Sequence, residues 1–298
     1  MICKTGTGEY LPVPLALGGV IMKAIPSVWS GYFNELSAEQ AMEQLAKAGF
    51  TRTELWTGFL DRMLQQDDPE KAGRELGRFA ADQGVRITQG HMRYKHGLCS
   101  KEAVEFLKQD LAVFAGVGIT QAVLHINGGA QLENQERHDI WVKNIAAASE
   151  FAEGTGITVC LENLNAVPEA RTADSLLEFI EESGGKNLGI CLDTGHLHLS
   201  NQQEHIRQSQ GEFIRKAGKY LQAMHVASNS GLADDQQMPY SARHDLDWKD
   251  VISALRQIDY AGLFNAEIHG EREAPLPVKI KKLEYIRWMM DYMLSDQF

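Results

Sequence analysis

The stretch ITVCLENLNAVPEARTADSLLEFIEESGGKNLGICLD, residues 157–193, decides the fold. It begins with an apolar run rich in β-branched residues at 157–163 and ends with a second apolar run at 188–193. Between them, Leu176, Leu177 and Ile180 recur at the spacing of one helix face. A strand, a helix and a further strand in so short a stretch form a βαβ unit, in which the two strands are parallel neighbours in one sheet.

The same alternation extends in both directions along the chain. Short apolar runs, each followed by a longer amphipathic segment, occur at 23–29, 50–56, 85–91, 120–126, 157–163, 188–193, 220–226 and 262–268. Eight such units match the (β/α)₈ TIM barrel, whose typical length is about 250 residues. We therefore predict an α/β protein with one TIM-barrel domain over residues 22–298. A doubly wound sheet is the alternative, but it needs fewer strands and usually a glycine-rich turn after the first strand.

Helix boundaries are marked at several places between the apolar runs. Ser37 with Gln40 forms a capping box, and Asp247 is placed to cap a helix that follows it. Between 104 and 114 an apolar face is predicted from Val104, Leu107, Leu111 and Phe114. Several glycines stand where a helix should end in a left-handed residue, namely Gly49, Gly84, Gly118, Gly156 and Gly262.

Composition narrows the class of protein further. The chain has 298 residues with 29 Lys and Arg against 40 Asp and Glu, a net charge of −11, and no concentrated basic run. This balance argues against nucleic acid and anionic membranes as partners. The four cysteines lie far apart without a C-x-x-C pair, which is typical of reduced thiols and predicts a cytoplasmic protein. The apolar stretch 11–22 is interrupted by prolines and too short for a bilayer, so residues 1–21 are predicted to be an irregular N-terminal extension rather than a signal.

Nearly every predicted strand ends in a side chain that can titrate or bind a metal. In chain order these are Glu54, His91, His125, Glu162, Asp193, His225 and Glu267. The C-terminal ends of the strands of a barrel converge on one mouth, so these distant residues should meet at one site.

Four of these residues predict a cation site. The carboxylates of Glu162, Asp193 and Glu267 are set in apolar runs, where burial is costly unless they are paired or bind a cation. Together with His225 they form a mainly oxygen ligand set for one divalent cation, with Mn²⁺ the first choice and Mg²⁺, Co²⁺ or Zn²⁺ as alternatives. Cys160 and Cys191 each lie two residues before a carboxylate and are expected deeper in the barrel core, not on the metal.

Position 196, three residues beyond Asp193, is expected on the loop above this site. There, His196 could donate to a substrate oxygen or bind a second metal ion.

These motifs resemble those of the xylose-isomerase-like barrel superfamily, in particular its sugar and sugar-phosphate isomerase and epimerase branch. The likeness spans about residues 22–294. It depends on TELW at 53–56, LEN at 161–163, LDTGH at 192–196, MHVAS at 224–228, DLDW at 245–248 and YAGLFNAEI at 260–268.

The resemblance implies roles for several residues. Glu162, Asp193, His225 and Glu267 match the four metal ligands of ketose 3-epimerases and hydroxypyruvate-isomerase-like enzymes. The two glutamates would also exchange protons with carbon, and His196 would contact a substrate oxygen. The chain departs from ketose 3-epimerases at VASNSG, residues 226–231, which lacks the arginine that those enzymes place after the strand-seven histidine.

A second relative, the DNA-repair enzyme endonuclease IV, binds three zinc ions through further histidines and an additional aspartate. Part of that set is matched by His91, His125, His196 and His244. Ala242 stands where the aspartate is expected.

The sequence therefore predicts a metal-dependent sugar isomerase or epimerase that moves a proton through an enediolate. Its partner is a small sugar or polyol, favoured as unphosphorylated because no basic pair stands out, and the chain could also form a homo-oligomer. Side chains expected to bind the substrate are Trp56, His91, Tyr94, His125, His196 and His244. The alternatives are a metal-dependent dehydratase of an inosose or dehydroshikimate, an endonuclease IV-like phosphodiesterase, and a non-catalytic sugar sensor.

Overall fold

The computed structural model describes residues 22–243, 245–269 and 274–298. Eight strands close into a parallel barrel in which each strand pairs with the next and the last pairs with the first. They are β1 (Ile25–Trp29), β2 (Arg52–Leu55), β3 (Arg86–His91), β4 (Gln121–His125), β5 (Thr158–Glu162), β6 (Leu188–Asp193), β7 (Leu221–Val226) and β8 (Leu263–Ala266). Each lies within one of the eight apolar runs, so the predicted TIM barrel is confirmed. The predicted extension at 1–21 lies outside the described residues.

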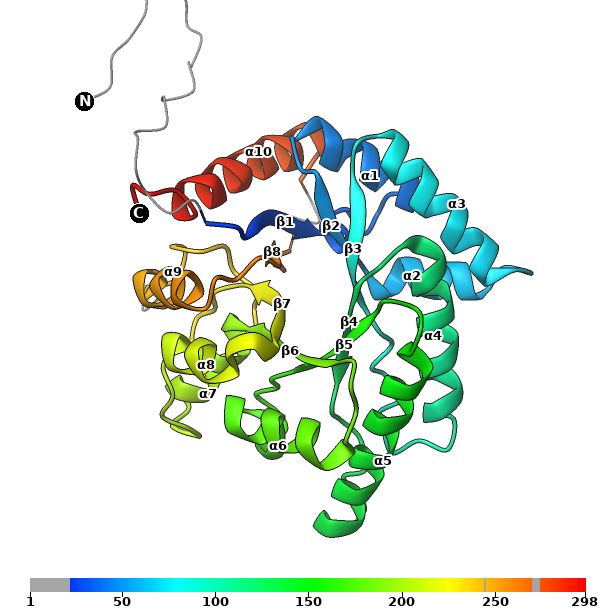
Figure 1. The fold of residues 1–298 in the computed structure, drawn as a ribbon. Helices are drawn as coiled ribbons and strands as arrows, with labels where there is room; N and C mark the ends of the chain where they lie inside the picture. The colour runs from blue at the N-terminus through cyan, green and yellow to red at the C-terminus, as the bar shows by residue number, and fades with distance from the viewer. Residues whose placement is uncertain (1–21, 244, 270–273) are drawn as a thin grey trace, which may run out of the picture.

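Helices surround this barrel as an outer ring (Figure 1). The α-helices are α1 (Ala38–Lys47), α2 (Thr57–Leu64), α3 (Pro69–Asp82), α4 (Ala103–Val117), α5 (Asn134–Ala152), α6 (Ala173–Ser183), α7 (Thr194–Gln202), α8 (Gln210–Ala217), α9 (Trp248–Gln257) and α10 (Leu276–Met293). The strands are covered on both faces, which explains why they read as apolar runs instead of alternating with polar residues.

The core has two parts. A large cluster fills the space between the strands and the outer helices. A small separate cluster contains side chains of neighbouring strands, Val123, Cys160, Cys191 and Ala223. Both of these cysteines are completely buried, as predicted, and the pKa of the Cys160 thiol is raised by burial.

The helix signals are mostly confirmed. Ser37 and Gln40 form the capping box of α1, and Asp247 caps α9 by accepting from two backbone N–H groups. Three details are wrong. Gly154, with φ of 77°, and not Gly156, follows the C-cap of α5. Val104 is 40% exposed although it was placed on the buried face of α4. Gly262 does not end α9, because Asp259 adopts the left-handed conformation there, with φ of 54°.

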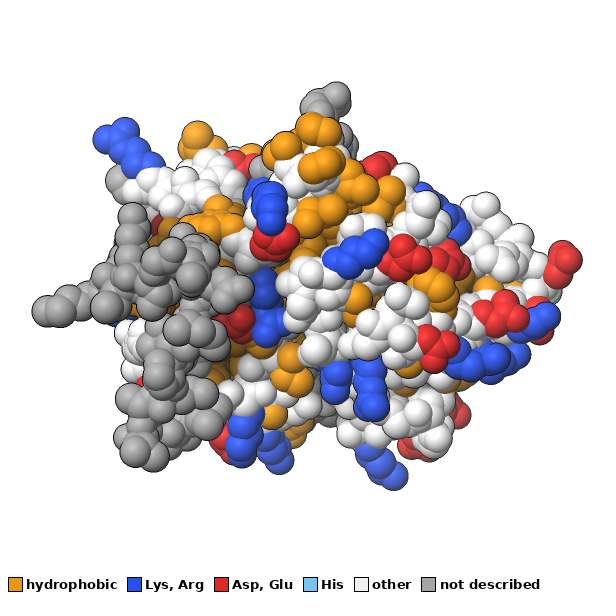
Figure 2. All heavy atoms as spheres, turned by 90° about the horizontal axis from the view of Figure 1, so that it is seen from above, with side chains coloured by type: hydrophobic (Ala, Val, Ile, Leu, Met, Phe, Trp, Pro, Cys, Tyr) orange, Lys and Arg blue, Asp and Glu red, His pale blue; other side chains and the backbone are white. Residues whose placement is uncertain are grey.

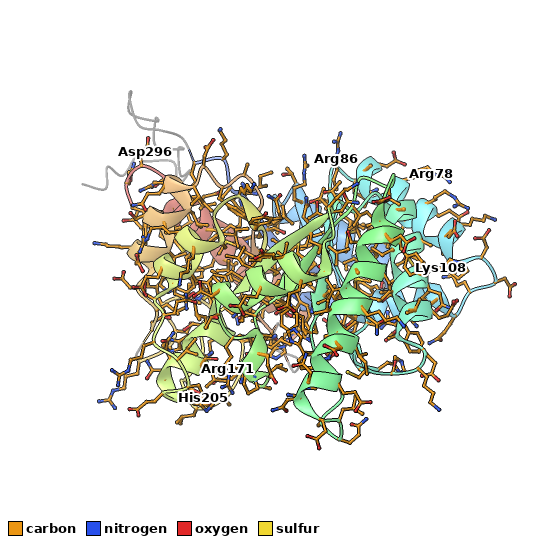
Figure 3. The ribbon with its side chains drawn as sticks, turned by 60° about the horizontal axis from the view of Figure 1, so that its bottom comes forward. Arg78, Arg86, Lys108, Arg171, His205 and Asp296 are labelled. Carbon is orange, nitrogen blue, oxygen red and sulfur yellow. The ribbon has the colours of Figure 1, made fainter. Side chains whose placement is uncertain are left out.

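The outer surface of the barrel carries charges of both signs beside exposed hydrophobic side chains, among them Tyr285, Trp288 and Tyr292 of α10. Figure 2 shows acidic and basic side chains interspersed on one face, without a broad patch of either sign. Within the part of the chain that the structure describes, no helix combines the length and apolarity needed to cross a bilayer. In Figure 3, Arg86 at the start of β3 and Arg171 beyond the end of β5 lie at opposite ends of the barrel. The mouth formed by the C-terminal strand ends is therefore at the Arg171 end.

Candidate functional site

The mouth of the barrel brings together the four residues that the sequence singled out as metal ligands. His225, near the end of β7, is the centre of the group, with its Nδ1 facing three carboxylates. This nitrogen lies 2.9 Å from Glu267 Oε2, 3.2 Å from Glu162 Oε1 and 3.9 Å from Asp193 Oδ2. Glu162 and Asp193 are the last residues of β5 and β6, and Glu267 directly follows β8.

The geometry of this group fits one divalent cation. Each of the four residues offers a ligand atom within 4.8 Å of the others, and all four side chains are buried. Oε2 of Glu162 is buried and makes no hydrogen bond of good geometry with a described residue, although Nε2 of His125 lies 2.8 Å from it. Three carboxylates buried side by side are costly, and a cation is the group that would compensate their charge.

Burial and the neighbouring histidines shift the pKa values of the three carboxyl groups in opposite directions. Burial raises the pKa of Asp193 to about 7, although His196 acts against this shift. Burial would also raise the pKa of Glu162, but the neighbouring His125 and His225 outweigh it and hold that pKa well below its ordinary value. For Glu267, His225 likewise outweighs burial and lowers the pKa. The two glutamates are therefore ionised at neutral pH, and Asp193 is the ligand closest to titrating there.

Glu54 orients His225 from the side opposite the ligand group. Its carboxylate oxygens lie 3.0 and 3.1 Å from Nε2 of His225, and Oε2 also accepts from Gln89 Nε2 at 2.9 Å and Asn265 Nδ2 at 2.5 Å. Histidines that bind metals commonly donate their second ring nitrogen to a carboxylate in this way, which fixes the ring and the tautomer. Glu54 therefore does not belong to the group of candidate ligands but is the partner of one of them.

Asn163 holds the start of the next helix in place. Its Oδ1 accepts from the backbone N–H of Asp193 at 2.7 Å, and its Nδ2 donates to the Asp193 carbonyl at 3.0 Å. Asp193 in turn caps α7 by accepting from the N–H of His196 at 2.8 Å. His196 therefore lies in the first turn of α7, and the expectation that it stands on a loop is wrong.

His196 has a partner on each ring nitrogen. Nδ1 lies 2.9 Å from the carbonyl of Asn163, and Nε2 lies 3.2 Å from Oδ2 of Asp234. Both partners only accept hydrogen bonds, so both nitrogens carry a proton. The imidazole therefore faces the cavity as a donor.

His91 and His125 form a second group with Glu162. His125 Nε2 lies 2.8 Å from Glu162 Oε2, His91 Nε2 lies 3.4 Å from the same oxygen, and the two Nε2 atoms are 3.1 Å apart. Nδ1 of His91 lies 2.8 Å from the carbonyl of Met92 and donates to it. Burial acts to lower the pKa of this imidazole, but Glu162 outweighs burial and raises it. These three residues could also hold a metal ion, with Glu162 shared between the two groups.

A cavity of about 470 Å³ opens above the ligand group. Trp56 and Tyr94 line it together with His91, His125 and His196, all of which are predicted to contact a substrate. Trp29 packs edge-on against Trp56 with ring centroids 6.5 Å apart, so one wall is aromatic. His244, the remaining predicted contact, lies outside the described residues.

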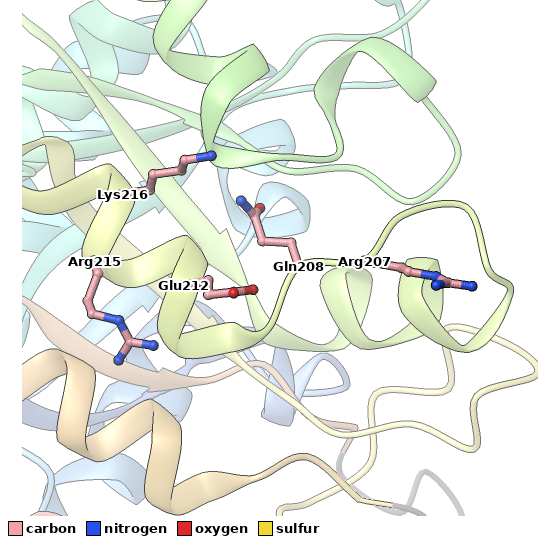
Figure 4. Close-up of a pocket in the computed structure, with 5 residues that line it drawn as sticks. All are labelled: Arg207, Gln208, Glu212, Arg215 and Lys216. Carbon is pink, nitrogen blue, oxygen red and sulfur yellow. The ribbon is translucent and has the colours of Figure 1, made fainter.

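Another hollow of about 490 Å³ lies on the outer side of the barrel, against α8 (Figure 4). Its lining residues are Arg207, Gln208, Glu212, Arg215 and Lys216. Lys216 is paired with Asp174 and Arg215 with Asp250, so most of its positive charge is neutralised. It contains none of the residues at the strand ends and is not the candidate site.

Three contributors to the site were not identified from the sequence in the roles that they play. Glu54 was noted only as a strand-end carboxylate, whereas Asn163 and Asp234 were not singled out. The LEN motif contains Asn163 beside a ligand, which could have suggested a positioning role. Asp234 lies in the loop between β7 and α9 and has no local signal.

Comparison with known proteins agrees with this architecture. The family model described as xylose isomerase-like TIM barrel matches residues 42–292. A D-psicose 3-epimerase of Agrobacterium fabrum is 26% identical over 256 residues, which cover 78% of each chain. An L-ribulose 3-epimerase of Mesorhizobium japonicum is 25% identical over 248 residues, covering 78% of this chain and 76% of that protein.

Among solved structures, D-psicose 3-epimerase from Clostridium cellulolyticum, determined with D-tagatose, superposes with a TM-score of 0.76 at 19% identity. The match covers 91% of this chain and 99% of that one. With the family model matching most of its length, this chain belongs to the xylose isomerase-like TIM barrel family.

Proposed function

We propose that this chain is a divalent-metal-dependent sugar isomerase or epimerase that moves a proton on a keto-sugar or a polyol-derived ketone through an enediolate. One observation carries the proposal. Two buried glutamates, Glu162 and Glu267, reach the same nitrogen of His225 from β5 and β8, which lie three strands apart around the barrel. Two carboxylates that approach one point from different sides suit the removal and return of a proton.

Glu162, Asp193, His225 and Glu267 would hold the cation. When bound, a divalent ion polarises a carbonyl and stabilises negative charge that develops on adjacent oxygens. The protein's part is to keep the ligand set rigid, since Glu54 fixes the ring of His225 and Asn163 fixes the backbone of Asp193.

The glutamates would act as base and acid. Because their pKa values are held low, each is available as a carboxylate that accepts a proton from the carbon next to the carbonyl. If the other glutamate, which has first taken up a proton from the solvent, delivers that proton to the opposite face of the carbon, the product is an epimer. If the proton returns to the neighbouring carbon, the product is an aldose or ketose isomer. His196 would donate from Nε2 to a substrate oxygen.

The relatives named as D-psicose and L-ribulose 3-epimerases support an activity of this class. They do not identify the sugar, because residues 226–231 lack the arginine expected of ketose 3-epimerases. We therefore propose the reaction class and leave the position of the proton transfer to experiment.

The test is hydrogen exchange from the solvent. The protein is stripped of metal, reloaded with Mn²⁺ and incubated in deuterated water with a panel of ketoses and inososes. Deuterium is expected at the carbon next to the carbonyl. Glu162→Gln and Glu267→Gln should each reduce the exchange rate by at least about 100-fold, the range for a lost general base.

Glu182→Gln is the matched control, because it alters a glutamate paired with a histidine, His138, on the outer helices. This variant should retain full exchange, and circular dichroism and metal content are recorded for all three. Exchange that survives both site variants contradicts the catalytic assignment. Products that lack a hydroxyl group would assign the dehydratase reaction instead. Phosphodiester cleavage with about three metal ions per chain would assign the hydrolytic one.

A further inference from the structure

The loop between β7 and α9 places an acidic side chain at the cavity. Asp234 lines the cavity beside His196, with its Oδ2 3.2 Å from Nε2 of the imidazole. Its side chain is 34% exposed, whereas that of His196 is 10% exposed. Asp234 therefore stands at the border between the closed site and solvent, where the distant end of a bound substrate would pass.

Gln236, two residues further on, adds a second acceptor. Its Oε1 is buried and has no hydrogen-bond partner among the described residues, and the residue lines the same cavity. Its φ of 43° is unusual for a residue other than glycine, and such backbone strain persists only where the surroundings impose it. Here the imposing contact is a two-way backbone pairing of Ser228 with Gln237, at 2.8 Å in each direction.

The charge of the described lining residues disfavours an anionic group beside Asp234. No described residue that lines the cavity is a lysine or an arginine, whereas Glu162, Glu267 and Asp234 are all acidic. The two glutamates belong to the ligand group, so Asp234 is the additional acidic residue of the lining, and the protonated His196 is its partner. A phosphate or carboxylate at this place would only accept hydrogen bonds and would be repelled by the Asp234 carboxylate.

A hydroxyl group fits the same place. It can accept from Nε2–H of His196 and at the same time donate to Oδ2 of Asp234. A second hydroxyl could donate to the unpaired Oε1 of Gln236. Adjacent hydroxyl groups therefore satisfy all three side chains, which neither a phosphate nor an apolar group can do.

We infer that Asp234 and Gln236 are specificity-determining residues that select a neutral, unphosphorylated polyhydroxy substrate by accepting hydrogen bonds from its hydroxyl groups. The inference rests on the proposed function, because it assigns the substrate class of the same site. A charged side chain that accepts a hydrogen bond from a ligand hydroxyl typically makes the affinity about tenfold or more higher than for a ligand without that hydroxyl.

Binding of inert analogues tests the inference without any turnover. Calorimetry with the Mn²⁺-loaded full-length protein compares a hexitol with the matching hexitol 6-phosphate. The hexitol should bind at least about tenfold more tightly. Equal or tighter binding of the phosphate, or no binding of the hexitol, overturns the inference.

Variants of the loop between β7 and α9 test which residue causes the preference for the hexitol. Asp234→Asn should lower the preference for the hexitol over its phosphate by at least about fivefold. Asp235→Asn removes the same charge one residue away, from a side chain that accepts from Ser230 and Gln237 and does not line the cavity. This control should change the preference by less than about twofold. An equal change in both variants contradicts the role of Asp234.

Gln236 is tested by removal and by conservative replacement. Gln236→Leu should weaken hexitol binding about fivefold, whereas Gln236→Glu, which keeps an acceptor, should restore it. Unchanged hexitol binding by Gln236→Leu contradicts the role of this residue.

Solvent exchange separates this inference from the proposed function. If ketoses and ketose phosphates exchange deuterium equally well, the function stands and the inference fails. If nothing exchanges but the hexitol preference and its loss in Asp234→Asn are observed, the inference stands and the proposed reaction fails.

Discussion

Replacing Glu54 tests whether the site depends on a carboxylate that does not itself bind the ion. Its Oε2 accepts from His225, Gln89 and Asn265, whereas Oε1 lies at hydrogen-bond distance from Nε2 of His225. A glutamine whose carbonyl oxygen replaces Oε2 keeps all three acceptor contacts but turns an NH₂ group toward the His225 N–H. We therefore expect Glu54→Gln to weaken metal binding about tenfold, or about 1.4 kcal/mol. This is the lower end of the loss in affinity that follows when the hydrogen-bond partner of a metal-binding histidine is replaced.

Glu54→Ala should do more. It removes the partner of His225 and also leaves the amide donors of Gln89 and Asn265 buried without their acceptor. We expect a loss of about 100-fold in metal affinity, with destabilisation of about 1–3 kcal/mol for each unsatisfied donor. The assay is calorimetric titration of the metal-free protein with Mn²⁺, combined with urea unfolding. Glu182→Gln is again the control. Affinities of both Glu54 variants within twofold of the parent protein would refute the role of Glu54.

Two further predictions concern the ligand group. Burial raises the pKa of Asp193 to about 7, so this carboxyl is neutral below that pH in the metal-free protein and must lose its proton to bind an ion. Calorimetry in buffers of different ionisation enthalpy should show about one more proton released per ion at pH 6 than at pH 8, and equal numbers would contradict the prediction. Removal of metal with a chelator should lower stability by about 2.7 kcal/mol relative to protein with ion at 100 times the dissociation constant, which lowers the Tm by about 5 °C in calorimetric scans. An unchanged Tm would mean that the four ligands hold no ion.

The barrel could be predicted because each strand is buried on both faces and is therefore a continuous apolar run bounded by helical periodicity. Closure then follows from the number of units, and closure brings the strand ends together. The ligand group could be predicted for the same reason, since its members are the polar residues at the ends of these runs. They did not have to be close in the sequence, because closure of the barrel brings the strand ends together.

Other features depend on contacts that no local pattern encodes. Asp234 and Gln236 reach the cavity because the backbone of Ser228 pairs with Gln237, and this pairing is visible only in the folded chain. Asp259, not Gly262, takes the left-handed position after α9, because aspartate also tolerates this conformation. For His196 a local signal did exist. Asp193 is a capping residue placed three positions before it, so the start of α7 could have been predicted.

The central claim is that one divalent ion is bound by Glu162, Asp193, His225 and Glu267. A crystal structure of the Mn²⁺-loaded protein, with anomalous scattering recorded above the manganese absorption edge, tests it most directly. We predict one strong anomalous peak bound by these four side chains, with Nδ1 of His225 as its only nitrogen ligand from this group. A peak found only between His91, His125 and Glu162, or no peak at the mouth of the barrel, would contradict the claim.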